Sequence, residues 1–240
     1  MKRAIVLSLA LAAVSPVHGA DPAELLRRVD EARNPLKSFV VDVELTSYEK
    51  GRTSVSKYRV YGKGSDRSLV EFREPATDKG KFLLMSRDAM WIYLPDTSRP
   101  IRISPLQRLS GQASNGDVAR TSFTVDYEAR EAAEDRVEER DAWRLDLVAR
   151  DPAVAYKSVR LWIDRGTLQP IMADFSVVSG KRIKRAHYRE YGTMARRSVV
   201  TLVEIEDLLR PGFRTVMRYS NLQEKDNPEK MFNKESLGKW

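Results

Sequence analysis

Apolar residues stand at every second position in segment after segment of this 240-residue chain, and this alternation constrains its fold more than any other feature. In one example, Phe39, Val41, Val43 and Leu45 alternate with residues that are mostly polar. Successive side chains of a β-strand point to opposite faces, so the pattern predicts a strand with one buried face. About ten or eleven segments share it, separated by turn signals rich in glycine, and together they predict an antiparallel meander.

A sheet of this size with one apolar face is expected to curl. Open twisted sheets with many strands tend to bend into a trough or a partial barrel, and the apolar face then lines the inside. The predicted fold is therefore α+β and mainly β: a curled antiparallel sheet of about 10–11 strands that forms an incomplete barrel, with helices covering its open face.

Three segments predict those helices. Residues 21–24 (DPAE) predict a helix start, in which Asp21 accepts the amide of the third helical residue and Glu24 completes a capping box. Residues 104–109 predict a short helix with a serine cap and a proline in its first turn. Residues 227–230 predict another cap near the end of the chain. A loop rich in glycine, serine and asparagine is expected at 110–117.

The composition allows a folded core and excludes several functions. Hydrophobic residues make up 42% of the chain and the mean hydropathy is −0.48, which suits a globular core and is too polar for a polytopic membrane protein. The chain has no cysteine. It can therefore form no disulfide, no thiolate metal site and no cysteine nucleophile, and it offers no cysteine for lipid attachment.

Residues 1–20 have the features of a signal peptide. Lys2 and Arg3 precede an apolar run from residue 4 to residue 14, and small residues suit cleavage after Gly19 or Ala20. A transmembrane anchor needs about 20 apolar residues, which is more than this run provides. The mature chain is therefore expected to be exported and soluble.

The sequence offers little for catalysis. It contains no GxSxG, P-loop, GxGxxG or HExxH motif. After the signal peptide His187 is the only histidine, and its position in the basic segment 184–189 predicts that it faces solvent. The acidic residues between 129 and 141 are expected to form a charged, solvated stretch. We therefore expect no enzyme, no metal site and no cofactor.

The chain is basic, with a formal net charge of +8, and several of its cations fall between residues 181 and 197. Export argues against nucleic acid as the partner. Two interpretations remain open. The cations could attract lipid phosphates or an acidic partner protein, or they could form the solvated outer face of alternating strands.

Several segments in a fixed order resemble a known family. They are 67–75 (RSLVEFREP), 79–84 (KGKFLL), 90–95 (MWIYLP), 99–104 (RPIRIS), 159–164 (VRLWID), Gly180-Lys181 and 231–237 (MFNKESL). Together they resemble the LolA superfamily, in its divergent branch of outer-membrane lipoprotein-sorting proteins. The resemblance covers nearly the whole mature chain.

The resemblance implies that residues 21–240 form one LolA-like lipid- or lipoprotein-binding domain of the periplasm. In such a domain an incomplete barrel with a helical lid encloses an apolar cavity that holds acyl chains in transit toward the outer membrane. The implied partners are an acylated lipoprotein or lipid cargo, an inner-membrane transporter of the ABC or RND type, and an outer-membrane acceptor. Peripheral contact with a membrane is compatible with this role. We cannot match the gating arginine of the family to any one arginine here.

Strand parity selects the residues expected to line the cavity. They are Phe39, Val41, Val43, Tyr58, Val60, Val70, Phe72, Leu84, Ile92, Leu145, Leu161 and Phe175, with Leu106 and Leu109 on the covering helix. The same alternation would arise if these residues only filled a core. Trp91 and Tyr93 have the opposite parity from Ile92. They are therefore expected either to lie on the surface at an interface with a partner or, if the parity of this strand is reversed, to face inward.

Two other functions remain open from the sequence. A sensor or transporter adaptor could use the same fold to bind lipid without carrying cargo. An enzyme of the cell envelope could use a pair of carboxylates. Lipid that co-purifies with the protein would distinguish a carrier from an adaptor.

Overall fold

The computed structural model describes residues 20–87, 89–97, 99–119, 122–152 and 154–238, so the predicted signal peptide, apart from Ala20, lies outside the described residues. Helix α1 (Pro22–Arg33) begins where the sequence predicts it. The Asp21 carboxylate accepts a hydrogen bond of 3.0 Å from the amide of Ala23, one residue earlier than expected. Glu24 pairs with Arg27 and does not complete a capping box.

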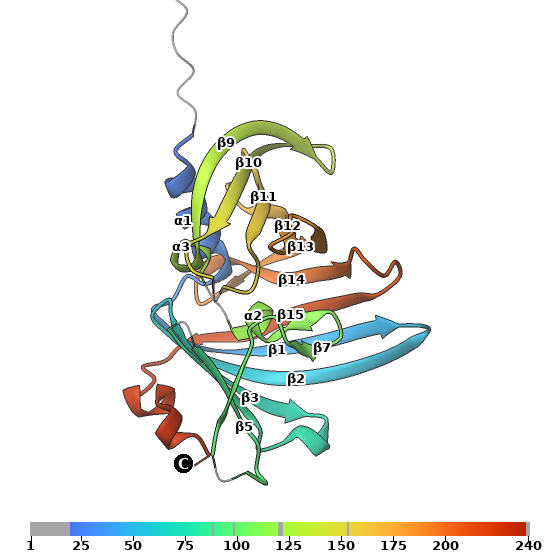
Figure 1. Cartoon of the computed structure of the whole chain (residues 1–240). Coiled ribbons are helices and arrows are strands. Elements are labelled where there is room, and N and C mark those ends of the chain that lie inside the picture. The colour runs from blue at the N-terminus through green and yellow to red at the C-terminus, as the bar shows by residue number, and fades with distance from the viewer. Residues whose placement is uncertain (1–19, 88, 98, 120–121, 153, 239–240) are drawn as a thin grey trace, which may run out of the picture.

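Thirteen strands of the described chain form one antiparallel sheet (Figure 1). Its first half contains β1 (Ser38–Glu49), β2 (Arg52–Lys63), β3 (Arg67–Glu74), β4 (Phe82–Ser86), β5 (Ala89–Tyr93) and β6 (Ile101–Ile103), with a 3-10 turn, η1 (Ala76–Asp78), between β3 and β4. Its second half contains β9 (Tyr127–Val137), β10 (Arg140–Ala149), β11 (Ser158–Asp164), β12 (Pro170–Ser176), β13 (Arg182–Met194), β14 (Arg197–Asp207) and β15 (Arg214–Glu224).

The first and last strands of the chain pair in the middle of this sheet. The strand order runs β6-β5-β4-β3-β2-β1-β15-β14-β13-β12-β11-β10-β9, so β6 and β9 are its two edges. The sheet is curled and not closed, which confirms the predicted mainly β, incomplete barrel. The predicted count of 10–11 strands is too low, because the described chain has 15 strands, two of them in a separate hairpin.

The segment that joins β6 to β9 has to pass from one edge of the curled sheet to the other. This crossing segment (residues 104–126) contains β7 (Arg108–Ser110), β8 (Ala113–Ser114), α2 (Asn115–Ala119) and α3 (Phe123–Asp126). In Figure 1, β7 and α2 lie in front of β1 and β15. The topology thus places the crossing segment over the concave face.

The predicted helix at 104–109 is wrong. Ser104 caps only a turn, in which its hydroxyl accepts from the Leu106 amide at 3.2 Å, and the chain then enters the hairpin β7–β8. A helix of six residues has little stability of its own. The hairpin is anchored on the sheet instead, since the Gln112 amide donates to the Thr215 hydroxyl at 2.8 Å. The first helix of the crossing segment is α2, which begins inside the loop expected at 110–117 and ends at Ala119.

Gly111 shows how closely this hairpin approaches the sheet. Its φ is +54°, which favours glycine, and a Cβ at this position would lie 1.9 Å from the Ser47 hydroxyl oxygen and 2.3 Å from that of Thr215. Ser47 and Thr215 are a directly opposed pair of β1 and β15 and hydrogen-bond each other at 3.1 Å. The hairpin turn therefore rests directly on the two central strands.

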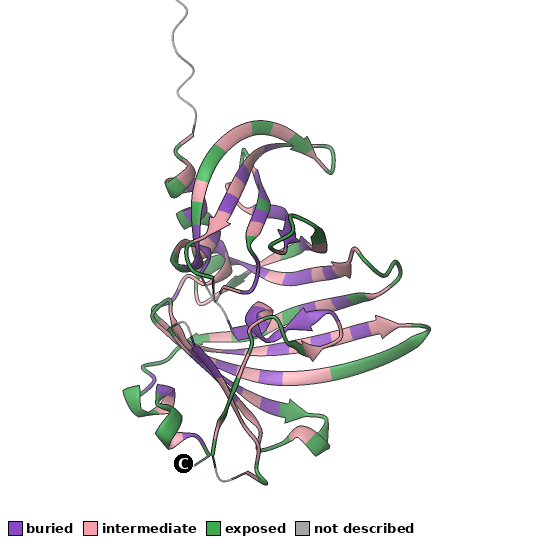
Figure 2. Cartoon of the chain, in the orientation of Figure 1, coloured by how far each residue is buried: buried purple, intermediate pink, exposed green. Residues whose placement is uncertain are grey.

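The two faces of the sheet carry separate hydrophobic clusters. The main cluster joins the inward side chains of the strands to the apolar faces of α1, α2 and α3. A second cluster contains Leu69, Leu84, Phe232 and Leu237, with Trp91 and Tyr93 packed against it. Figure 2 shows the resulting alternation of buried and less buried positions along the strands.

The C-terminal segment (residues 225–238) covers the outer face and not the open face that the sequence predicted for it. Its two 3-10 turns, η2 (Glu229–Phe232) and η3 (Lys234–Ser236), lie beside β3 and β5 in Figure 1. Phe232 and Leu237 insert between this segment and the sheet. Trp91 and Tyr93 therefore face outward, as their parity indicates, beneath the chain's own C-terminal segment.

Charged side chains form a paired layer on the outer face. Arg182 and Arg185 hydrogen-bond the fully buried Asp174 at 3.0 and 2.6 Å. His187 is buried, and its Nδ1 lies 2.7 Å from Glu138, so the prediction that it faces solvent is wrong. The expected solvated stretch at 129–141 is mostly the edge strand β9, in which exposed charged residues alternate with partly buried ones. Its small residues Ala129 and Ala132 pack against the main cluster.

Candidate ligand-binding cavity

Ten of the twelve residues predicted to line a cavity lie in the main hydrophobic cluster, on the face that the crossing segment covers. They are Phe39, Val41, Val43, Tyr58, Val60, Val70, Phe72, Leu145, Leu161 and Phe175. All ten are at least nine-tenths buried. Tyr58 and Phe72 form an edge-to-face pair with ring centroids 5.1 Å apart. The predicted strand parity therefore brings these residues together.

The other two residues are placed differently. Leu84 is fully buried in the second cluster on the outer face, and its strand turns Leu83 and Met85 inward. The prediction that Leu84 lines the cavity is therefore wrong. Strand β4 is apolar on both faces, so its sequence does not indicate which residues face inward. Ile92 lies opposite Leu83 in the register and shares its inward face, but it is only partly buried.

The two residues predicted for the covering helix lie on the crossing segment without forming a helix. Leu109 is part of β7 and packs against the main cluster. Leu106 lies in the preceding turn with 44% of its surface exposed. The crossing segment covers the concave face mainly through Ala113, Val118, Ala119 and Phe123, which are buried in the main cluster.

Two small cavities lie between the sheet and its covering elements. The first, which we name the Phe175 cavity, has a volume of about 60 Å³ and also touches Phe123, Tyr156 and Ile205. The second, the Phe39 cavity, has a volume of about 50 Å³ and also touches Val41, Val60 and Val200. Both are lined by the same five residues, Arg33, Asp117, Tyr188, Val203 and Tyr219, which form the partition between them.

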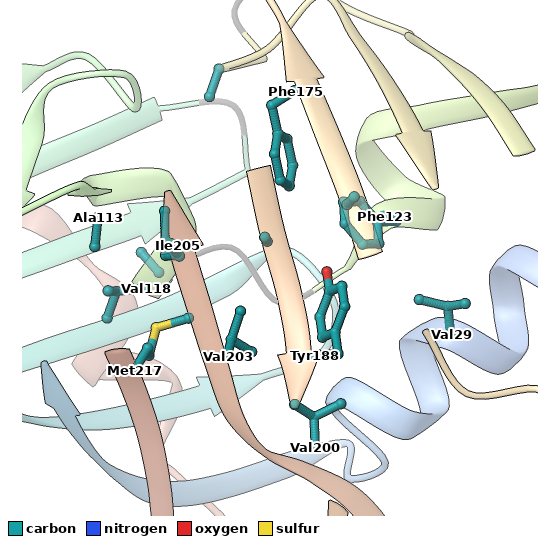
Figure 3. Packing of buried hydrophobic residues seen from close by; sticks show 14 of the residues in the cluster. Val29, Ala113, Val118, Phe123, Phe175, Tyr188, Val200, Val203, Ile205 and Met217 are labelled. Carbon is teal, nitrogen blue, oxygen red and sulfur yellow. The ribbon is translucent and has the colours of Figure 1, made fainter. Parts of the chain in front are cut away.

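These cavities are far smaller than a binding site for a lipid. Pockets for small organic ligands are typically about 300–1,000 Å³. In this conformation side chains of the protein fill most of the concave face, and Figure 3 shows Tyr188, Val203, Ile205 and Met217 packed within it. An acyl chain can therefore enter only if covering elements move or these side chains repack.

A buried ion pair fastens α2 to the sheet. The carboxylate of Asp117 accepts from the ammonium group of Lys184 on β13, and the two side chains are 9% and 10% exposed. The Tyr156 hydroxyl donates to Asp117 at 3.0 Å and accepts from Lys184 at 2.5 Å. Burial, followed by the charge of Asp117, raises the pKa of Tyr156 well above its usual value. All three side chains line the Phe175 cavity.

Arg33 is the basic residue that faces both cavities in the described chain. Its side chain is 18% exposed and its guanidinium carbon lies 4.3 Å from the centroid of the Phe123 ring. Burial alone would lower the pKa of Arg33, but the ionisable groups of Tyr188, Asp30, Tyr219 and Asp117 outweigh burial and raise it. Arg33 therefore remains a cation inside the concave face.

A groove on the rim of the curled sheet lies next to the Phe175 cavity. Its volume is about 200 Å³ and it runs between the hairpin β7–β8 and the β14–β15 turn, past Leu106, Leu209 and Arg210. Tyr156 and Lys184 line both this groove and the Phe175 cavity. Tyr156 and Lys184 thus stand between the groove and the cavity.

The sequence analysis missed the polar residues of the site, although two of them carry a signal. Arg33 follows Val29 by four positions and Leu26 by seven, so it lies on the apolar stripe of α1. Lys184 shares strand parity with Ala186 and Tyr188, which are buried in the main cluster. A cation at an inward position is costly without a partner, and both positions could have been selected on that ground. Asp117 gives no such signal, because no alternation covers α2.

The structure shows no helix, within the residues it describes, that is long and apolar enough to cross a membrane. A family model with the description "Uncharacterized protein" matches residues 64–239. The comparison with curated proteins gives no match.

Solved structures with the same fold cover most of the chain. A LolA superfamily protein from Nitrosomonas europaea is 34% identical with a TM-score of 0.84, over 90% of this chain and 99% of that one. A DUF1329 family protein from Desulfovibrio piger is 22% identical with a TM-score of 0.77, over 91% of this chain and 100% of that one. A domain from Vibrio parahaemolyticus, described as an outer membrane lipoprotein-sorting protein, is 18% identical with a TM-score of 0.76, over 91% and 98%.

The latter two likenesses show the shared fold alone. The Nitrosomonas europaea protein shares both the fold and 34% of its sequence, over nearly the full length of both chains. The chain belongs to the LolA superfamily.

Proposed function

We propose that this protein is a non-enzymatic periplasmic carrier that shelters the acyl chains of a lipoprotein or lipid during transit toward the outer membrane. The observation that carries the proposal is the concave face, where ten predicted residues and the apolar sides of three helices meet in one cluster. Five of the ten, Phe39, Val41, Val43, Val60 and Phe175, line the two cavities, and the other five lie in the packed part of the cluster. The predicted signal peptide, residues 1–20, supports export to the periplasm.

The free energy of hydration explains why such a carrier is needed. Each methylene group removed from water gains about 0.8 kcal/mol, so a long acyl chain in water costs on the order of 10 kcal/mol. An apolar interior removes most of that cost. Because the chain has no nucleotide-binding motif, the direction of transfer would follow from the affinities of donor and acceptor.

Uptake requires the concave face to open. The crossing segment covers this face, and its α2 is fastened by the Asp117–Lys184 pair. The groove past Leu106 and Leu209 shares Tyr156 and Lys184 with the Phe175 cavity, so movement of these two side chains would join the cavity to the rim. We propose that α2 and the hairpin β7–β8 move away from the sheet when cargo binds, so that Leu106 and Leu109 act as part of a mobile cover.

The small volume of the cavities favours a second function. A protein whose interior is nearly filled by its own side chains could act as a lipid sensor or transporter adaptor, in which binding changes the cover and no cargo is carried. An inner-membrane transporter and an outer-membrane acceptor are the partners of the carrier; the adaptor requires only the former.

Lipid transfer between vesicles tests the carrier function. Donor vesicles would hold a self-quenched fluorescent diacyl phospholipid, and in a parallel assay a fluorescent triacylated lipopeptide. A carrier speeds the rise in fluorescence in proportion to protein concentration. Binding of the probe without faster transfer would support the adaptor, and the absence of both binding and transfer would contradict both functions.

A further inference from the structure

Three polar side chains face the cavities with few partners of their own. Arg33 has five N–H donors, and among the described residues its only ion pair is with Asp30, 3.7 Å away. The Tyr188 hydroxyl makes no hydrogen bond to the described residues, and Tyr219 has only a weak contact of 3.4 Å to the Met217 sulfur. Tyr188 is 5% exposed. Arg33 and Tyr219 are only partly buried, and in the described chain the fully buried side-chain atoms without a hydrogen-bond partner belong to Asn34, Arg144 and Asn227. The polar ends of Arg33, Tyr188 and Tyr219 instead face the free space of the cavities, where a ligand can meet them.

The nearby carboxylates do not supply the missing acceptor. Both oxygens of Asp30 are occupied at the start of α3, where they accept from the amides of Phe123 and Thr124 at 2.7 and 2.8 Å and from the Ser122 hydroxyl at 2.7 Å. Asp117 accepts from Lys184, Tyr156 and the Ser114 amide. Asp126, the remaining acid of the Phe175 cavity, is engaged in an interaction of its own.

The three side chains converge on one place. Arg33, Tyr188 and Tyr219 all belong to the partition that lines both cavities. They come from α1, β13 and β15, so the fold brings them together from distant parts of the chain. In Figure 3 the Tyr188 hydroxyl points toward the rings of Phe123 and Phe175 and away from α1. Apolar side chains, among them Val203, surround this group of donors.

We propose that Arg33, Tyr188 and Tyr219 form a subsite for the oxyanion of an amphiphile, a carboxylate or a phosphate, whose acyl chain lies among the apolar residues around them. A guanidinium and two phenol hydroxyls can all donate hydrogen bonds to such a group, and a charge-assisted hydrogen bond in an apolar surrounding is stronger than a neutral one. The inference rests on the proposed function and adds to it the class of ligand: of the two proposed cargoes, a lipid with an anionic head group, bound with its head inward.

Displacement of a neutral fluorescent probe, N-phenyl-1-naphthylamine, tests the subsite. The competitors are dodecanoate, dodecyl phosphate and the uncharged dodecanol, which share one chain length, together with inorganic phosphate. We expect the two anionic amphiphiles to bind about tenfold or more tightly than dodecanol, since a hydrogen bond to a charged group is worth that much. Whether dodecanoate or dodecyl phosphate binds more tightly identifies the preferred head group.

The variants R33M, Y188F and Y219F test the residues. R33M should remove the preference for the anionic amphiphiles while leaving dodecanol binding within about twofold, because it keeps the apolar stem. Each tyrosine variant deletes one hydroxyl and should reduce the preference in part. R28M is the matched control, since Arg28 lies on the exposed side of the same helix. Circular dichroism spectra like that of the wild type would show that each variant is folded, and if R33M fails to fold the two tyrosine variants carry the test.

The outcomes separate this inference from the function it rests on. Equal binding of dodecanol and of both anionic amphiphiles, or a preference that survives in R33M or in both tyrosine variants, would overturn the anionic subsite and leave the acyl-chain function standing. Inorganic phosphate that binds as tightly as dodecyl phosphate would overturn the assignment to an amphiphile's head group. Failure of every amphiphile to displace the bound probe would overturn the subsite, whereas the carrier function is decided separately by the transfer of the phospholipid and the lipopeptide between vesicles.

Discussion

Asp117 of α2 and Lys184 of β13 form a buried ion pair that ties the crossing segment to the sheet beneath it. The pair is the charged connection between a short helix and a strand 67 residues away in sequence. A buried pair contributes little net free energy, but loss of one partner is costly because it leaves the other charge buried alone. The cover of the concave face is therefore held by an interaction that is sensitive to single substitutions.

Substitution of the pair should loosen the cover. K184M is expected to lower the free energy of unfolding by about 3–5 kcal/mol, and the double variant D117N/K184M by clearly less, because it leaves no unpaired buried charge. Urea unfolding of the wild type, both single variants and the double variant gives the coupling energy. If the loss of stability in the double variant equalled the sum of the two single losses, the two side chains would not interact energetically.

Filling the partition between the cavities should block the proposed binding. Val203 lines both cavities, and V203F adds bulk where free space remains. We expect weaker binding of the fluorescent acyl probe, with an overpacking cost of about 1–3 kcal/mol in stability. V55F, at a position 43% exposed, is the control and should change neither property. Unchanged probe binding in V203F would place the acyl chain elsewhere.

The stability of the protein should fall in acid in part because of Asp174. Burial alone would raise the pKa of Asp174, but hydrogen bonds and charges from Arg185 and Arg182 outweigh it and hold the pKa below its usual value. A carboxyl group whose pKa is lowered by folding stabilises the protein above the pKa of the unfolded chain, about 3.9, and that contribution is lost as the pH falls through the lower folded value.

The variant D174N isolates this contribution. It should be less stable than the wild type by about 2 kcal/mol at pH 7. The difference should shrink below about pH 4, because Asp174 then takes up a proton in the unfolded wild type before it does so in the folded protein, whose Asp174 pKa is lower. Urea unfolding at pH 7, 5, 4 and 3 measures the difference. If the difference in free energy of unfolding between the wild type and D174N stayed constant across this range, the charge of Asp174 would not contribute to stability.

Detachment of the C-terminal segment should expose an apolar patch on the outer face. Phe232 is 5% exposed and packs with Leu69 and Leu84. F232A removes most of that contact, and truncation of a buried phenylalanine costs about 3–5 kcal/mol when the whole fold depends on it. We expect faster amide exchange in residues 225–238 and greater binding of an apolar dye. K230A, at an exposed position of the same turn, should behave like the wild type.

Gly111 and Gly180 offer a matched pair for the docking of the hairpin β7–β8. Both have positive φ, +54° and +79°, so an alanine at either position carries backbone strain of about 1 kcal/mol. A Cβ at Gly180 meets nothing within 4 Å, whereas at Gly111 it meets Ser47 and Thr215. G111A should therefore destabilise the protein more than G180A in thermal unfolding. Equal losses would mean that the hairpin is not held against β1 and β15.

The comparison of sequence and structure separates what alternation can reveal from what it cannot. Phe39, Val41 and Val43 alternate with polar residues, so their inward orientation could be predicted. Leu83, Leu84 and Met85 are apolar in succession, and only the register of β4 decides that Leu84 faces outward. The helix predicted at 104–109 was wrong because a segment of six residues adopts the conformation that its tertiary contacts stabilise.

The sequence by itself determined the class of fold, because the two-residue period of apolar side chains permits only strands with one buried face, repeated often enough to require a curled sheet. The tertiary structure alone decided where that sheet opens and what covers it. Because β1 pairs with β15, the first and last strands of the chain lie in the middle of the sheet. The two edges are then β6 and β9, and the crossing segment that joins them passes over the concave face. The same pairing also brings Arg33, Tyr188 and Tyr219 together, since contacts between residues so distant in sequence depend on the strand order, which no local pattern encodes.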